Sequence, residues 1–157
     1  MNNLKKWNKR FFDMATLVAS WSKDPSTKVG CVIVRPDRTI ASVGYNGFPR
    51  GVNDDPEIYE NRPEKYLRIV HAEANAILSA KEPLHGYTLY VTPLHPCANC
   101  AGLIIQAGIK NVLFGLQEGE RSEAWKSHFD AMRSMFCDAD VFFDAFGINN
   151  DGGVHVL

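Results

Sequence analysis

The sequence predicts an α/β protein built as a three-layer α/β/α sandwich. Short runs rich in β-branched residues alternate along the chain with segments that have helical periodicity. The first two β-rich runs lie close enough together for an antiparallel hairpin, whereas helical segments that can act as parallel crossovers separate the later ones. We therefore expect a mixed five-stranded sheet with an antiparallel first hairpin.

The N-terminal part begins with a helix and continues with the hairpin. Residues 4–21 repeat apolar side chains at three- and four-residue intervals, the spacing of one helix face. These side chains are Leu4, Trp7, Phe11, Met14, Val18 and Trp21. The runs 29–35 and 39–45 have strand composition, and the proline and aspartate between them favour a turn. An irregular glycine-rich loop follows.

The remaining chain alternates helices and strands. Helices are predicted over 71–81, 97–107 and 122–136, and strands over 87–92, 110–115 and 140–143. Gly108 is typical of a residue that ends a helix. We expect residues 1–146 to form a single domain and residues 147–157, which are rich in glycine and asparagine, to be a loose C-terminal tail.

Length and composition limit the class of protein. The 157 residues suffice for one domain with its own core, and the formal net charge of -1 argues against a general nucleic-acid-binding protein. No apolar run approaches the roughly 20 residues of a membrane span, and the N-terminus is too charged for a signal peptide. We expect a cytoplasmic protein with neither a nucleic-acid nor a membrane partner.

Two short motifs indicate a zinc-dependent hydrolytic site. His71-Ala72-Glu73 and Pro96-Cys97-Ala98-Asn99-Cys100 supply one histidine and two cysteines, and three protein ligands leave a zinc position open for water. Glu73 is placed to move protons to and from that water. H-x-E followed by P-C-x-x-C is the signature of zinc deaminases that attack C4 of cytosine or C6 of adenine.

The predicted helices support this site. His71 and Cys97 each fall at a helix start, where the positive end of the helix dipole favours a thiolate. The alternative is a structural zinc site completed by Cys31, His95 or Cys137, and Cys31 could also belong to a second zinc site. A role for His95 in lining the pocket and a role in packing both remain open.

The chain resembles the deoxycytidylate (dCMP) deaminases from about Trp7 to Phe143. Four segments carry the resemblance: Ser22 to Gly30, Gly44 to Gly51, His71 to Ile77, and Pro96 to Ile109. The resemblance implies a sandwich of the cytidine deaminase type and the hydrolysis of dCMP to dUMP and ammonia by zinc-activated water. It also implies activation by dCTP, inhibition by dTTP, Mg²⁺ with the regulatory triphosphate, and a homo-oligomer, with a hexamer favoured over a dimer.

The same resemblance implies roles for further residues. The loop containing Ser22, Lys23, Asp24 and Thr27 would hold the substrate phosphate, and Asn46 would bind sugar or base. Together with Asn46, Gly47 and Arg50 would face the regulatory nucleotide. The chain departs from this family in one respect. Many dCMP deaminases carry a tyrosine after the fourth strand, whereas no tyrosine follows Tyr90 here, and Arg121 is a candidate for a phosphate contact in its place.

Three other functions remain open. A tRNA adenosine deaminase shares the zinc motifs but needs a basic surface for its polyanionic substrate, which the near-zero charge does not favour. A free cytidine or cytosine deaminase differs in needing no 5′-phosphate. A non-catalytic zinc- or nucleotide-binding module is the third alternative, although it would have no use for the proton-transferring Glu73.

Overall fold

The computed structural model describes residues 3–117, 123–149 and 154–156. The helices are α1 (Asn3–Ala19), α2 (Pro56–Glu60), α3 (Arg62–Arg68), α4 (Ala72–Ser79), α5 (Ala98–Gln106) and α6 (Glu123–Asp138). The strands are β1 (Gly30–Val34), β2 (Ile40–Tyr45), β3 (Thr88–Thr92), β4 (Asn111–Gln117), β5 (Phe142–Ile148) and β6 (Val154–Val156). Within the described ranges, no helix combines the length and hydropathy that a membrane span requires.

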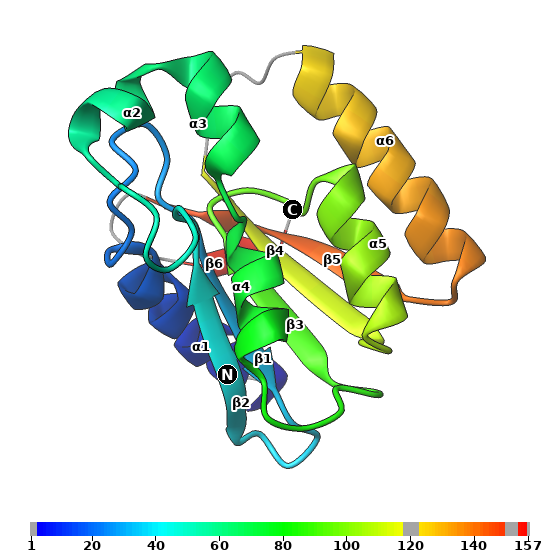
Figure 1. Cartoon of the computed structure of the whole chain (residues 1–157). Helices are drawn as coiled ribbons and strands as arrows, with labels where there is room; N and C mark the ends of the chain where they lie inside the picture. Colours follow the sequence, from blue (N-terminus) through cyan, green and yellow to red (C-terminus); the bar gives the residue numbers. More distant parts are fainter. Residues whose placement is uncertain (1–2, 118–122, 150–153, 157) are drawn as a thin grey trace.

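The strands form one mixed sheet in the order β2-β1-β3-β4-β5-β6. β1 and β2 pair antiparallel, which confirms the predicted hairpin, and β3, β4 and β5 are mutually parallel, as their crossover helices require. β1 also pairs antiparallel with β3, so the hairpin is joined to the parallel part of the sheet. The order from β2 to β5 can be followed in Figure 1.

The sheet has six strands, which corrects the predicted count of five, and the sixth strand lies within the range predicted as a loose tail. β5 continues past Phe146 to Ile148, and β6 pairs antiparallel with it. The β-branched residues of the short β6 sequence suit an edge strand, but glycines and asparagines before it obscure this signal. Gly147 permits the pairing, because a Cβ there would lie 2.2 Å from Nε2 of His155.

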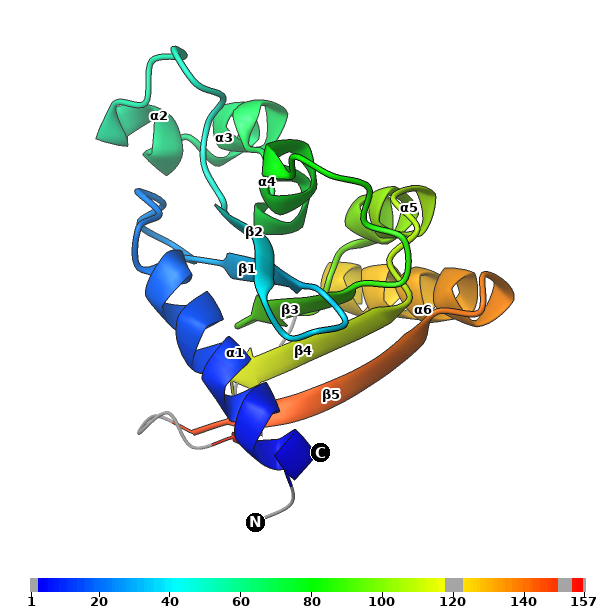
Figure 2. The same ribbon diagram turned by 90° about the horizontal axis from the view of Figure 1, so that it is seen from below.

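Helices cover both faces of the sheet, and this confirms the three-layer architecture. α1 lies on one face, while α4, α5 and α6 lie on the other (Figures 1 and 2). β1 shows the alternation that creates two cores. Val32 and Val34 pack with Phe12 of α1, whereas Cys31 and Ile33 belong to the core beneath α4, α5 and α6.

α4 packs unusually close to β2, and this contact fixes the start of α4. A Cβ on Gly44 would lie 2.3 Å from the backbone nitrogen of Ala76 and 2.4 Å from the carbonyl oxygen of Ala72, so only glycine fits. Ser42 Oγ also donates a hydrogen bond to the Ala76 carbonyl at 2.7 Å. The helix that begins next to His71 is therefore held against the sheet.

Two features of the helices differ from the sequence-based expectation. α1 ends at Ala19, so Trp21 lies beyond the helix and is 52% exposed instead of joining its apolar face. α2 and α3 have no counterpart among the predicted elements. α3 nevertheless carries a local start signal, because Asn61 caps it by accepting a hydrogen bond from the Glu64 N–H and proline occupies its first turn.

Candidate active site

The two zinc-type motifs meet where two helices begin. His71 is the N-cap of α4 and Cys97 is the N-cap of α5. Nδ1 of His71 lies 3.4 Å from Sγ of Cys97 and 3.5 Å from Sγ of Cys100. The three ligand-type atoms all lie within 4.8 Å of one another. The fold thus brings together His71 and the two cysteines, which are 26 and 29 positions away in sequence, as the zinc motifs predict.

The geometry of this cluster fits a tetrahedral zinc ion. With Zn–S near 2.3 Å and Zn–N near 2.0–2.1 Å, tetrahedral angles place sulfur and nitrogen about 3.5 Å apart. The observed separations of 3.4 and 3.5 Å match that value. Among the residues that the structure describes, it is the one group of three histidine, cysteine or carboxylate side chains close enough to share an ion. Cys31 is fully buried in β1 and lies outside it.

The electrostatics of the cluster favour a bound cation. Hydrogen bonds with the Cys100 thiol and with His71 hold the pKa of Cys97 well below its usual range. The backbone N–H of Cys100 also points at the Cys97 sulfur, at 3.4 Å. This N–H belongs to the first turn of α5, where unpaired donors stabilise negative charge. A thiolate is the form of cysteine that binds zinc.

Glu73 is buried beside the cluster. It lies in the first turn of α4, its side chain is 4% exposed, and burial raises the pKa of its carboxyl group. Glu73 lines the same cavity as His71 and Cys97. A raised pKa makes a carboxyl group hold its proton more readily, which suits a group that both accepts and donates protons. The site therefore combines a cluster of candidate metal ligands with a candidate acid–base group.

The cavity has a volume of about 350 Å³ and reaches from this cluster to the loop before β1 and to α3. Its lining residues are Asp24, Ser26, Thr27, Val29, Asn46, Arg62, Lys65, Tyr66, Ile69, His71, Ala72, Glu73, Leu94, His95, Cys97 and Trp125. Three of the residues predicted to bind substrate, Asp24, Thr27 and Asn46, are thus placed around it. Ser22 and Lys23 are not part of the lining.

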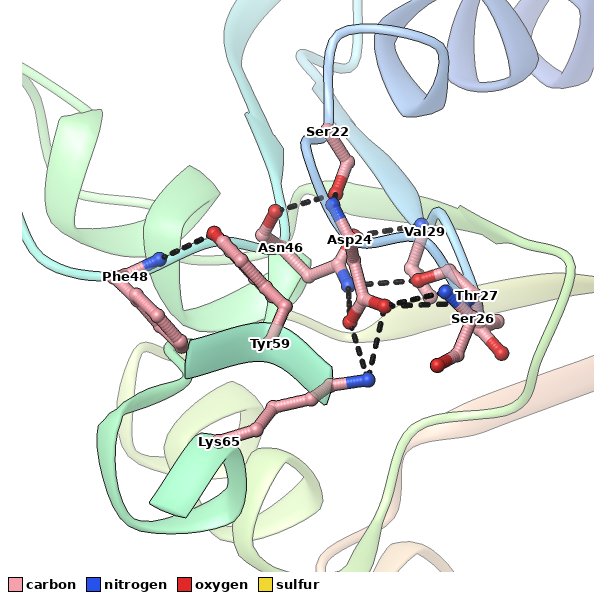
Figure 3. Close-up of polar contacts among 9 residues, drawn as sticks. All are labelled: Ser22, Asp24, Ser26, Thr27, Val29, Asn46, Phe48, Tyr59 and Lys65. Carbon is pink, nitrogen blue, oxygen red and sulfur yellow. Dashed lines mark hydrogen bonds and ion pairs between the residues drawn. The ribbon is translucent and has the colours of Figure 1, made fainter. Parts of the chain in front are cut away.

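Asp24 is the centre of a buried polar network (Figure 3). Its carboxylate accepts hydrogen bonds from Lys65 Nζ at 2.9 Å and from the Ser26 N–H at 2.8 Å, and it forms an ion pair with the same ammonium group at 2.7 Å. The Asn46 amide donates a longer bond of 3.3 Å to it. Other groups of the protein thus bind both Asp24 oxygens, and these contacts hold the loop that lines the cavity in its conformation.

Asn46 joins this loop to the hairpin. Its Oδ1 accepts the Val29 N–H at 2.8 Å, its Nδ2 donates to the Thr27 carbonyl at 2.9 Å, and its own carbonyl accepts from Ser22 Oγ at 2.8 Å (Figure 3). Ser22 is 2% exposed, so this hydroxyl is used internally. The asparagine predicted to touch sugar or base therefore also fixes the cavity wall.

The remaining predicted site residues lie further from the cavity. Lys23 is exposed and its ammonium pairs with Asp54. Gly47 exchanges two backbone hydrogen bonds with Val70, directly before His71, whereas Arg50 is exposed on the following turn. Arg121 lies outside the described residues.

Several lining residues were not anticipated. Three come from α3, namely Arg62, Lys65 and Tyr66, and Ile69 is its C-cap; the capping signal at Asn61 indicates this helix. His95 resolves the question left open by the sequence: it lines the cavity and is also 2% exposed, with Nδ1 donating to the Pro96 carbonyl at 2.8 Å. The rings of Trp125 in α6 and His95 pack edge to face, with their centroids 5.2 Å apart.

The sequence model of the cytidine and deoxycytidylate deaminase zinc-binding region matches residues 5–116, a range that contains the whole cluster and Glu73. The chain belongs to the cytidine and deoxycytidylate deaminase family. Within this family it is 49% identical over 138 residues to an uncharacterized deaminase in the luxG 3′ region of Aliivibrio fischeri, covering 88% of this chain and 92% of that protein. Zinc is the metal that the family and the His/Cys/Cys cluster both indicate.

Other family members bear more specific names. Mouse deoxycytidylate deaminase is 41% identical over 147 residues, and the human enzyme is 39% identical over the same length; each alignment covers 90% of this chain and 80% of the relative. A dCMP deaminase of cyanophage S-TIM5, solved with dCMP and dUMP, has the same fold, with a TM-score of 0.66, 23% identity and coverage of 92% of this chain and 98% of that one.

Proposed function

We propose that this deaminase converts dCMP and water to dUMP and ammonia. The observation that carries the proposal is the His71, Cys97 and Cys100 cluster, which shares one cavity with the buried carboxyl group of Glu73. The mouse and human relatives named deoxycytidylate deaminase support the choice of substrate.

His71, Cys97 and Cys100 are proposed as the three protein ligands of a zinc ion. Their donor types and their separations near 3.5 Å support this assignment. Zinc bound by these three residues would lower the pKa of a bound water toward about 7 and so would supply a nucleophile at neutral pH. The ordered N-termini of α4 and α5 keep the ligand atoms in place before substrate arrives.

Glu73 is proposed as the proton carrier. Its carboxylate takes a proton from the attacking water, delivers a proton to ring N3 as the C4–O bond forms, and transfers the second water proton to the departing amine as the C4–N bond breaks. The products are uracil at the base and ammonia, so water supplies one oxygen and two hydrogens and the carboxylate returns to its starting state. Burial supports both halves of this role, because it keeps the pKa of Glu73 raised.

The cavity wall is proposed to orient the rest of the nucleotide. Asp24, Thr27 and Asn46 are retained in this role because they line the cavity, with Asp24 and Asn46 acting chiefly by holding the loop in shape. Ser22 supports the wall through its bond to the Asn46 carbonyl. Lys23 is no longer favoured as the phosphate-binding cation, because it pairs with Asp54 away from the cavity.

The finer expectations from the dCMP deaminase resemblance belong to the same proposal. They are activation by dCTP, inhibition by dTTP, Mg²⁺ with the triphosphate, a homohexamer and a cytoplasmic location. The bonds between Gly47 and Val70 support a regulatory role for the Gly47 loop, because they connect that loop to the residue next to His71. The need of zinc thiolates for a reducing compartment supports the location.

A substrate panel tests the proposal. Zinc-loaded protein is given dCMP, CMP, deoxycytidine and an adenosine-containing RNA hairpin in parallel, and ammonia release is measured for each. The proposal predicts turnover of dCMP well above that of the other three. Turnover of deoxycytidine at the same rate as dCMP, or of the RNA alone, would replace dCMP with that substrate class.

A further inference from the structure

One face of α3 forms part of the cavity wall. Arg62, Lys65 and Tyr66 line the cavity together with the C-cap residue Ile69, and the spacing of three and four residues places the first three on one face of the helix. Two of these four side chains are cationic. The cavity therefore meets a short basic stripe on the element opposite the loop that contains Asp24.

The cations near the cavity differ in how their charges are balanced. Lys65 pairs with Asp24, Lys23 pairs with Asp54 outside the cavity, and Arg68 pairs with Glu64 on the other side of α3. Arg62 is the cavity-lining cation for which the described part of the chain shows neither an ion pair nor a side-chain hydrogen bond. Among the residues that the structure describes, no side chain thus balances the charge of Arg62, which is exposed and lines the cavity.

We propose that Arg62 binds the 5′-phosphate of the substrate and so makes the enzyme select a nucleotide over a nucleoside. This inference rests on the proposed function. A pyrimidine base placed against Glu73 leaves the sugar and phosphate to the part of the cavity formed by residues 24–27 and α3. A phosphate carries close to two negative charges, and a guanidinium group binds it through two parallel N–H donors. The hydroxyl-bearing side chains of Ser26 and Thr27 line the same cavity and can add donors.

Lys65 has a different task. Two short contacts of 2.7 and 2.9 Å commit its ammonium group to Asp24, and its side chain is only 7% exposed. This buried pair joins α3 to the loop before β1, so Lys65 is a positioning residue that sets where Arg62 stands. We therefore expect the loss of Lys65 to weaken the binding of every ligand of the site, whereas the loss of Arg62 should weaken only the binding of ligands that carry a phosphate.

The test compares Arg62→Ala with Arg68→Ala in the zinc-loaded enzyme. Both variants remove one arginine from the same helix, but Arg68 is half-buried, is neutralised by Glu64 and does not line the cavity. We expect Arg62→Ala to raise KM for dCMP about 10- to 100-fold, the range for loss of a charged hydrogen-bonding partner, with kcat little changed. KM for deoxycytidine should stay at the wild-type value in both variants, and Arg62→Lys should restore part of the dCMP affinity.

A binding measurement separates this inference from the proposed function. Titration calorimetry with dUMP and deoxyuridine compares wild-type protein with Arg62→Ala, and it needs no turnover. Loss of dUMP affinity alone supports Arg62 as the phosphate ligand even if the reaction proves different. Equal losses for dUMP and deoxyuridine, or unchanged affinity for both, would overturn the inference and leave the proposed deamination standing.

Discussion

Lys65 Nζ lies 2.7 Å from Oδ2 and 2.9 Å from Oδ1 of Asp24, and both residues are almost completely buried. The partners are 41 positions apart in sequence. Their ion pair joins a short helix to a loop, and both elements line the cavity that contains Glu73. The shape of the cavity therefore depends on one long-range charge pair.

Lys65→Met is expected to lower the free energy of unfolding by about 3–5 kcal/mol, because it leaves the buried Asp24 carboxylate without its counter-charge. Urea denaturation at neutral pH measures the loss. Lys23→Met is the matched control, since the Lys23 pair with Asp54 is exposed and its removal should change stability far less. Similar losses in the two variants would show that the buried pair has no special role.

Glu73→Gln is expected to retain zinc and to lose turnover by about 10²- to 10⁴-fold, the usual contribution of a positioned acid–base group. The amide keeps the size of the buried side chain but cannot accept and return a proton. Steady-state rates with dCMP and zinc content of the same preparation are both measured. A near-normal rate in a zinc-replete variant is incompatible with the proton-transfer role.

Cys97→Ser is expected to lose the metal, because it removes the sulfur that both His71 and Cys100 contact. Zinc per protein chain after dialysis, measured by atomic spectroscopy, should fall from near one to near zero. Cys137→Ser is the control, since Cys137 is exposed on α6 and outside the cluster. Full zinc content in Cys97→Ser would mean that the metal is held elsewhere.

Tyr90 predicts a pH dependence of stability. Its hydroxyl donates to Asn8 Oδ1 at 2.9 Å, and burial raises the pKa of Tyr90 from 10.0 to about 12. The raised pKa means that the unfolded chain releases this proton first, so the stabilisation is fully present below pH 10 and is lost as the pH rises through 12. The loss should approach about 3 kcal/mol, at about 1.4 kcal/mol for each pKa unit, and should be absent in Tyr90→Phe. Parallel slopes for both proteins between pH 10 and 12 would contradict this.

The metal-type cluster could be predicted from sequence because its information is local. His71 and Glu73 are two positions apart, and Cys97 and Cys100 are separated by nearly one helical turn, so each pair is placed by the helix it starts. The three-layer fold was equally accessible, since hydrophobic periodicity marks each long helix and each central strand.

The cavity wall could not be predicted in the same way. The cation assigned to the substrate phosphate was Lys23, but its pairing with Asp54 and that of Lys65 with Asp24 depend on contacts across 31 and 41 positions. α3 does not follow from the pattern of apolar residues although Asn61 and proline mark its start, because the helix spans only 7 residues and shows little periodicity. β6, with 3 residues, is too short to show a pattern for the same reason.

The most direct test of the account is the release of dUMP and ammonia from dCMP by metal-stripped protein before and after addition of zinc. The account predicts no turnover in the stripped protein and recovery as zinc approaches one ion per chain, with Glu73→Gln inactive in both states. Failure of the zinc-loaded wild-type protein to deaminate dCMP, or equal activity with and without zinc, would contradict it.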